Sequence, residues 1–270
     1  KYLDTEDVHY IQKANGIFNW NSQTIGIDTA LVTSLSSKYN SKPVEACIPL
    51  VKHMVRYLAG TIGQKLKNHP DSLNTLVVAS DSDLAGMHSV DGDTRSRGCT
   101  VIFYKDMLID WWSSWVGQMT SSGQAETMAL STALRRAMHV KYIGEELGIL
   151  MPRVISVYVD ATVAISFAAD VGNPTCMKFV DLREDWVMEL RNRQIAQAIK
   201  IPTKRNPSDF GTKILDAGEF KRQRDYFLFT PKVEYKAPQE HNLTMMTNLA
   251  RADFGKFMGC SPLFGALFRG

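Results

Sequence analysis

Residues 76–86 read LVVASDSDLAG, an apolar run followed at once by two aspartates. The run predicts a short buried strand, and Asp81 lies just beyond it. Further along the chain, TVIFY (100–104) and MLIDWW (107–112) flank Lys105-Asp106. Two apolar runs separated by a polar pair predict two strands joined by a tight hairpin turn. Together the three segments predict three antiparallel strands in succession.

The rest of this region alternates helices with strands. A long helix is expected from Ser122 to about Leu147, and VISVYV (154–159) predicts another buried strand. After it we expect a short helix containing Val163, Ile165 and Phe167, a helix over Phe179–Arg193, a strand over Ala198–Ile201 and a short helix from Pro207. This order predicts an α/β fold, with a five-stranded mixed sheet and helices on both of its faces.

A helical segment precedes the sheet region. One short amphipathic helix is expected within residues 1–40, with Tyr10, Ile11, Ala14, Ile17 and Phe18 on its apolar face. Between Pro43 and Gly60, apolar residues recur at steps of three and four, which predicts a longer helix. The polar stretch KNHPDSLN (67–74) marks a boundary. We therefore expect a helical segment over 1–70, an α/β domain over 71–216 and a C-terminal extension over 217–270.

The composition excludes several classes of protein. Of 270 residues, 44% are hydrophobic and 22% charged, which excludes a disordered or fibrous chain. No apolar run approaches the roughly 18 residues of a membrane span, so no membrane partner is expected. The net charge of +3 permits a nucleic-acid partner without requiring one. The four cysteines are too scattered for a disulfide framework or a zinc site, so we expect free thiols. Because the sequence opens with Lys1 rather than Met, we expect a processed chain or a fragment.

Four acidic residues stand where strands end or helices begin: Asp81, Glu126, Asp160 and Asp209. Such positions can bring carboxylates to one edge of a sheet, where they repel one another unless a divalent cation neutralises them. Carboxylate oxygens suit Mg²⁺, and two such ions about 4 Å apart can activate a water and stabilise the leaving oxygen of a phosphodiester. Taken singly, each acid also has a structural explanation as a loop residue or a helix-start residue.

Five blocks in this order resemble the RNase H region of copia-type LTR retrotransposon polyproteins: SDSDLAG (80–86), DWWSS (110–114), TSSGQAETMAL (120–130), VYVDATVAI (157–165) and PSDFGTK (207–213). Upstream, LSSKY (35–39) and VRYLAGT (55–61) resemble the connection segment that precedes RNase H in those polyproteins. The resemblance implies an RNase H-like fold. It matches Asp81, Glu126, Asp160 and Asp209 to the family's catalytic, Mg²⁺-binding acids. No block resembles a polymerase palm, so we expect no copying of nucleic acid.

The chain also departs from the family's pattern. Ala161 stands where the family has Asn, Gln124 replaces a helix glutamate and Thr127 replaces an aromatic residue. Trp115-Val116 replaces a lysine pair expected to hold a nucleic-acid backbone, and Lys178-Phe179 replaces a Lys-His pair. Loss of groups that support metal ligands typically lowers affinity or activity about ten- to a hundred-fold. These departures favour a site with reduced activity.

The last forty residues form a separate feature. Residues 231–270 carry many large apolar side chains without a clear helix or strand period. An ordered extension of this length needs those side chains to be covered. We expect contact with a neighbouring protein or RNA at Phe254, Phe257, Met258, Leu263, Phe264 and Phe268. The alternative is a tail that caps its own domain.

Three functions fit these observations. An active enzyme would use Mg²⁺ to cut the RNA strand of RNA/DNA hybrids. A retroelement-derived protein could instead serve as a structural, RNA-associated subunit of a large ribonucleoprotein, such as a mitochondrial ribosome, with weak or no nuclease activity. The mitochondrion is then the expected location, with cytoplasm or nucleus as alternatives. A protein scaffold without RNA is the third. The departures and the tail favour the structural subunit.

Overall fold

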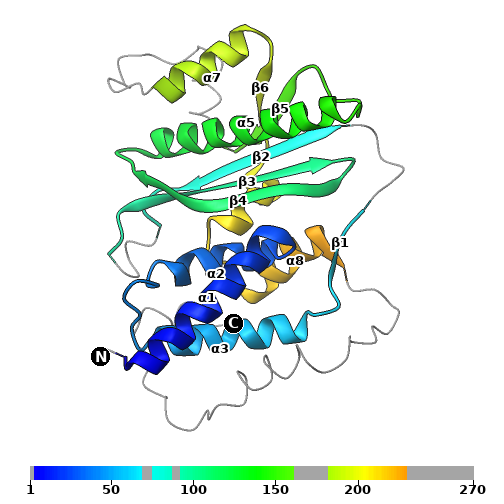
Figure 1. The fold of residues 1–270 in the computed structure, drawn as a ribbon. Helices are drawn as coiled ribbons and strands as arrows, with labels where there is room; N and C mark the ends of the chain where they lie inside the picture. Colours follow the sequence, from blue (N-terminus) through cyan, green and yellow to red (C-terminus); the bar gives the residue numbers. More distant parts are fainter. Residues whose placement is uncertain (1–2, 69–74, 87–91, 161–181, 230–270) are drawn as a thin grey trace. The chain divides into compact units, whose positions relative to one another are not determined.

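The structure is a computed structural model that describes residues 3–68, 75–86, 92–160 and 182–229 (Figure 1). The chain folds into two units, one formed by Lys67–Leu215 and the other by Lys1–Leu66 together with Asp216–Gly270. Among the described residues, no helix combines the length and the apolar character that crossing a bilayer requires.

The unit formed by Lys67–Leu215 is built on a five-stranded sheet of order β4-β3-β2-β5-β6. Its strands are β2 (Leu76–Asp83), β3 (Arg95–Tyr104), β4 (Met107–Gln118), β5 (Ile155–Val159) and β6 (Ala196–Lys200). The β2, β3 and β4 strands are antiparallel, whereas β5 runs parallel to β2 and β6 parallel to β5. The predicted mixed sheet and its RNase H-like order of elements are confirmed.

A two-residue turn joins β3 to β4, as the sequence predicted. Tyr104 pairs with Met107 across it. Lys105 and Asp106 between them have φ angles of 52° and 56°. Positive φ at both turn residues is the type I′ geometry, which matches the twist of the strands it connects.

Helices cover both faces of this sheet. Helices α5 (Ser122–Glu146) and α7 (Leu182–Asn192) pack on a core of apolar residues from β2, β3, β5 and β6. Two short 3₁₀ helices follow β6, namely η2 (Thr203–Arg205) and η3 (Pro207–Gly211). A Cβ on Gly98 of β3 would lie 3.4 Å from Ala129 of α5, whereas Cys99 contacts the η3 residue Gly211. Since successive strand residues point to opposite faces, α5 and η3 cover opposite faces.

The second unit is mainly helical. It contains α1 (Thr5–Thr24), α2 (Ile27–Ser37), α3 (Cys47–Gly60) and α8 (Ala217–Phe227), with the two-residue strands β1 (Lys65–Leu66) and β7 (Leu228–Phe229) paired to each other. Apolar side chains of α1 and α3 form its core, including Ile11, Ala14, Phe18, Val51, Met54 and Val55. The N-terminal helical segment is therefore present.

Several boundaries differ from the sequence prediction. Residues 1–40 hold two helices instead of one, and Ile17 is 37% exposed instead of buried. The helix expected from Pro43 begins at Cys47, and the final short helix is the 3₁₀ helix η3. Cys47 and Cys99 are buried free thiols. Outside the described residues lie the expected helix around Val163, Ile165 and Phe167, the family departures at Ala161, Lys178 and Phe179, the other two cysteines and the apolar tail.

Candidate metal centre

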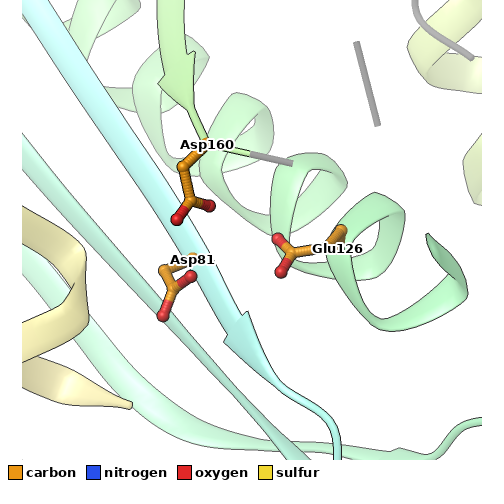
Figure 2. Close-up of side chains that lie close together, drawn as sticks. All are labelled: Asp81, Glu126 and Asp160. Carbon is orange, nitrogen blue, oxygen red and sulfur yellow. The ribbon is translucent and has the colours of Figure 1, made fainter. Parts of the chain in front are cut away.

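Two of the four predicted acids lie on neighbouring parallel strands. Strand β2 extends beyond its pairing with β5, whose last matched residues are Ala79 and Tyr158. If this pairing is extended by two residues, Asp81 of β2 lies beside Asp160, the residue directly after β5. The two carboxylates therefore meet where the sheet between β2 and β5 ends (Figure 2).

The third acid comes from the start of α5. Ser121 caps this helix by accepting a hydrogen bond of 3.2 Å from the backbone N–H of Gln124. The Gln124 Oε1 atom in turn accepts a hydrogen bond of 3.0 Å from the backbone N–H of Thr120. These two hydrogen bonds hold the N-terminal end of α5, and Glu126 lies at the start of its second turn. Gln124, a departure from the family pattern, thus stabilises the helix end that carries Glu126.

The three carboxylates form one compact group. Asp81, Glu126 and Asp160 each offer an oxygen, and these oxygens lie within 4.8 Å of one another. Figure 2 shows the three side chains pointing toward one another from β2, α5 and the end of β5. Asp81 is 1% exposed and Glu126 is 7% exposed, whereas Asp160 is partly buried. The sequence prediction that these acids converge is met for these three.

Burial of this group changes its acid–base behaviour. The pKa of Asp81 is raised to about 8, mainly by burial, with the charges of Asp209 and Glu126 adding to the rise and the charge of Lys213 and the Thr212 hydrogen bond opposing it. The pKa of Glu126 is raised to about 7, mainly by burial and also by the nearby Asp160 carboxylate, against the lowering effect of hydrogen bonding from Ser82. Both carboxyls therefore bind protons more tightly than in water. A cation placed among them would favour their ionised forms instead.

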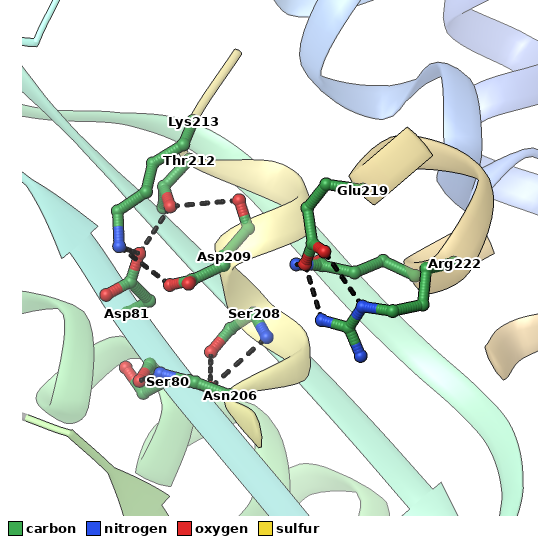
Figure 3. A network of polar contacts seen from close by, with 10 residues as sticks. Ser80, Asp81, Asn206, Ser208, Asp209, Thr212, Lys213, Glu219 and Arg222 are labelled. Carbon is green, nitrogen blue, oxygen red and sulfur yellow. Dashed lines mark hydrogen bonds and ion pairs between the residues drawn. The ribbon is translucent and has the colours of Figure 1, made fainter. Parts of the chain in front are cut away.

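The fourth acid, Asp209, lies on η3 and outside the group of three. Asn206 caps η3 by accepting a hydrogen bond of 3.2 Å from the Ser208 backbone N–H, and its Nδ2 atom donates to the Ser80 carbonyl at 3.1 Å. These bonds attach η3 to β2 next to Asp81 (Figure 3). The close approach needs glycine at position 211, because a Cβ there would lie 2.3 Å from the Cys99 sulfur.

Two residues that follow η3 complete the surroundings of Asp81. The Thr212 hydroxyl donates a hydrogen bond to Oδ2 of Asp81. The Lys213 ammonium lies 2.7 Å from Oδ1 of Asp209 and 3.5 Å from Oδ2 of Asp81. Sequence reasoning gave neither residue a role. The spacing of four between Asp209 and Lys213 was the one available signal, because residues so spaced can form an ion pair.

The three-carboxylate group fits a hard divalent cation. All its donors are carboxylate oxygens, which Mg²⁺ prefers in proteins. In the described part of the chain, the Oε2 atom of Glu126 is buried without a hydrogen-bond partner. A buried oxygen of this kind is costly unless a ligand or a proton satisfies it. The residues present therefore suit Mg²⁺, which would be held by Asp81, Glu126 and Asp160.

Two arginines lie near Trp115, one of the departures from the family pattern. From the sequence, Trp115-Val116 was expected to replace a lysine pair that helps hold a nucleic-acid backbone. The guanidinium groups of Arg95 and Arg97 lie 4.6 Å and 4.4 Å from the centre of the Trp115 ring. This geometry is a double cation–π contact. Arg97 is only 1% exposed, and Arg95 forms an ion pair of 2.6 Å with Asp93, so neither guanidinium replaces a phosphate-holding lysine.

No protein-family model matches the chain. Over 196 residues the chain is 27% identical to the retrovirus-related Pol polyprotein from transposon TNT 1-94 of Nicotiana tabacum. The alignment covers 72% of this chain and 14% of the polyprotein. The chain therefore spans only a small part of the length of this relative.

Solved structures with low sequence identity were also found. LC11-RNase H1, isolated from compost and solved with an RNA/DNA hybrid, is 16% identical with a TM-score of 0.38, over 51% of this chain and 94% of that one. An RNase H domain from Mycobacterium tuberculosis is 14% identical with a TM-score of 0.37, over 57% of this chain and 98% of that one. The foamy viral protease-reverse transcriptase in complex with double-stranded DNA is 16% identical with a TM-score of 0.40, over 74% and 42%. By its sequence match and the order of its strands, this chain is a distant homologue of copia-type Pol polyproteins with an RNase H-like fold.

Proposed function

We propose that the sheet unit is a Mg²⁺-dependent nuclease that cuts the RNA strand of RNA/DNA hybrids. The observation that carries the proposal is the convergence of Asp81, Glu126 and Asp160 at the end of the sheet, with oxygens within 4.8 Å of one another. Acids that are only structural gain nothing from this arrangement, because each raises the cost of ionising the next. The substrate class rests on the homology to retrotransposon Pol polyproteins.

Each residue of the centre has a role that follows from its position. When bound, a divalent cation supplies Lewis-acid stabilisation of a phosphate oxygen and makes an attacking water more acidic. Asp81, Glu126 and Asp160 hold that cation, with Asp81 fixed by the Thr212 hydroxyl. Lys213 places a fixed positive charge beside the same carboxylates. That charge favours the approach of an anionic phosphodiester to an otherwise negative site.

The structural-subunit interpretation, with its mitochondrial location, is the competing prediction. Its strongest sequence support, the apolar tail at 231–270, lies outside the described residues. Arg95 and Arg97 lie beside Trp115, but Arg95 is paired with Asp93 and Arg97 is buried, so they do not replace the lost lysines as phosphate contacts. The convergence of the three carboxylates is the observation that favours the nuclease.

The test is cleavage of a labelled RNA/DNA hybrid by the full chain in Mg²⁺. We expect cleavage of the RNA strand, its loss in EDTA and at least a 100-fold reduction in Asp160→Asn, because the variant loses a metal-binding carboxylate. Asp106→Asn is the matched control, since Asp106 lies in the β3–β4 turn at a positive φ that Asn tolerates. Absence of cleavage by the folded wild-type chain in either Mg²⁺ or Mn²⁺ would support the structural subunit instead.

A further inference from the structure

Lys213 lies between two of the four carboxylates. Its Nζ atom is 2.7 Å from Oδ1 of Asp209 and 3.5 Å from Oδ2 of Asp81, and Figure 3 shows the ammonium beside both acids. The Lys213 side chain is 37% exposed, whereas those of Asp81 and Asp209 are 2% and 11% exposed. Both acids are thus largely buried. The ammonium is a cation that they share.

The oxygens of Asp81 are divided between two tasks. Its Oδ2 atom accepts the hydrogen bond of the Thr212 hydroxyl and also faces Lys213. Both interactions fall on the same oxygen, which leaves Oδ1 for an ion shared with Glu126 and Asp160. Asp81 therefore links the lysine to the three-carboxylate group without any need for a second metal ion.

The two sides of the centre differ in whether their carboxylates still need a cation. On the Glu126 side, the buried Oε2 atom has no hydrogen-bond partner among the described residues. On the Asp209 side, the carboxylate is already paired with Lys213 at 2.7 Å. Asp209 also lies outside the group whose oxygens can surround one ion. The geometry therefore provides for an added cation on one side only.

The position of the ammonium leads to the same result. A second divalent ion between Asp81 and Asp209 would lie beside the Lys213 ammonium, where like charges repel. We propose that Lys213 fills the second cation position, so that the centre binds one divalent ion where two-metal nucleases bind two. This inference rests on the metal-dependent function proposed above.

The experiment measures stoichiometry without nucleic acid. Titration calorimetry of the full chain with Mn²⁺, and then with Mg²⁺, should give one bound ion per chain in the wild type. Lys213→Met keeps the aliphatic stem but removes the charge, and it should bind two. Lys213→Arg keeps the charge and should bind one. Lys105→Asn is the control for loss of one lysine charge, because Asn tolerates the positive φ of that turn residue. It should also bind one.

The outcomes separate this inference from the proposed nuclease. Two ions in the wild type overturn the role of Lys213 whether or not the chain cleaves hybrids. An unchanged single ion in folded Lys213→Met overturns it as well, and so does a folded wild type that binds no divalent ion. One ion in the wild type and two in Lys213→Met support it even if no hybrid is cleaved, a result that would count against the nuclease alone.

Discussion

Replacing Asp81 by Asn should stabilise the metal-free protein. Burial raises the pKa of this carboxyl from 3.8 to about 8. A carboxyl whose pKa rises on folding costs no stability below its unfolded-state pKa. The cost grows as the pH rises toward the folded-state pKa and is complete above it. At pH 7, about three pH units above 3.8, the loss amounts to about 4 kcal/mol. Asn carries no charge to bury, and its amide oxygen can still accept the Thr212 hydrogen bond.

The assay is urea unfolding in EDTA, followed by circular dichroism at two pH values. The free energy of unfolding of Asp81→Asn should exceed that of the wild type by about 4 kcal/mol at pH 7 and by about 2 kcal/mol at pH 5. Saturating Mg²⁺ should shrink or reverse the difference, because the ion stabilises only a chain that binds it. Asp106→Asn, in the exposed part of the hairpin turn, should change stability by less than about 0.5 kcal/mol. A less stable Asp81→Asn at pH 7 in EDTA, or an equal gain at both pH values, would refute the reasoning.

Two further substitutions test the supports of the centre. Gly211→Ala places a Cβ 2.3 Å from the Cys99 sulfur, so it should lower the free energy of unfolding by about 1–3 kcal/mol in urea. Gly63→Ala, which meets no atom within 4 Å, is its control, and equal effects of the two would show that η3 is not held by close contact. Trp115→Ala removes the ring shared by Arg95 and Arg97 and should cost about 1–2 kcal/mol in the same assay. Unchanged stability of Trp115→Ala would mean that the stack contributes nothing.

The parts of the fold that were predicted from sequence depend on local patterns. Strand β2 was predicted from an uninterrupted apolar run, and the hairpin from two runs around a polar pair. Helix α2 was missed because Ser and Thr make up much of its sequence, although its buried Ile27, Leu31 and Leu35 recur at steps of four. Helix α8 was missed too, despite a cap in which Asp216 accepts a hydrogen bond from the Glu219 backbone N–H. Both helices carried signals that a closer reading of period and capping could have found.

The parts of the centre that were missed depend on distant contacts. The acids could be predicted because strand ends and helix starts are visible in the sequence, and three of the four converge. The Thr212 hydroxyl reaches Asp81 across 131 positions of sequence. Lys213 reaches the same carboxylate, and no local pattern states that such a contact forms. The sequence therefore predicted which carboxylates could bind a metal ion. Only the packing of η3 on β2 shows that Lys213 lies beside Asp81, where its ammonium would compete with such an ion.

The departures from the family pattern have to be weighed in their surroundings. Gln124, counted as a lost glutamate, caps the helix that carries Glu126. Trp115, counted as a lost lysine, contacts Arg95 and Arg97, but Arg95 is paired with Asp93 and Arg97 is buried, so the lost phosphate contact is not replaced. A residue that is lost from a motif indicates lost function only if its physical contribution is also lost. Here Gln124 still caps the helix, the contribution of the lysines is not replaced, and the three carboxylates remain together. The buried Glu126 oxygen without a hydrogen-bond partner needs a proton or a cation to satisfy it, which supports the proposed metal binding.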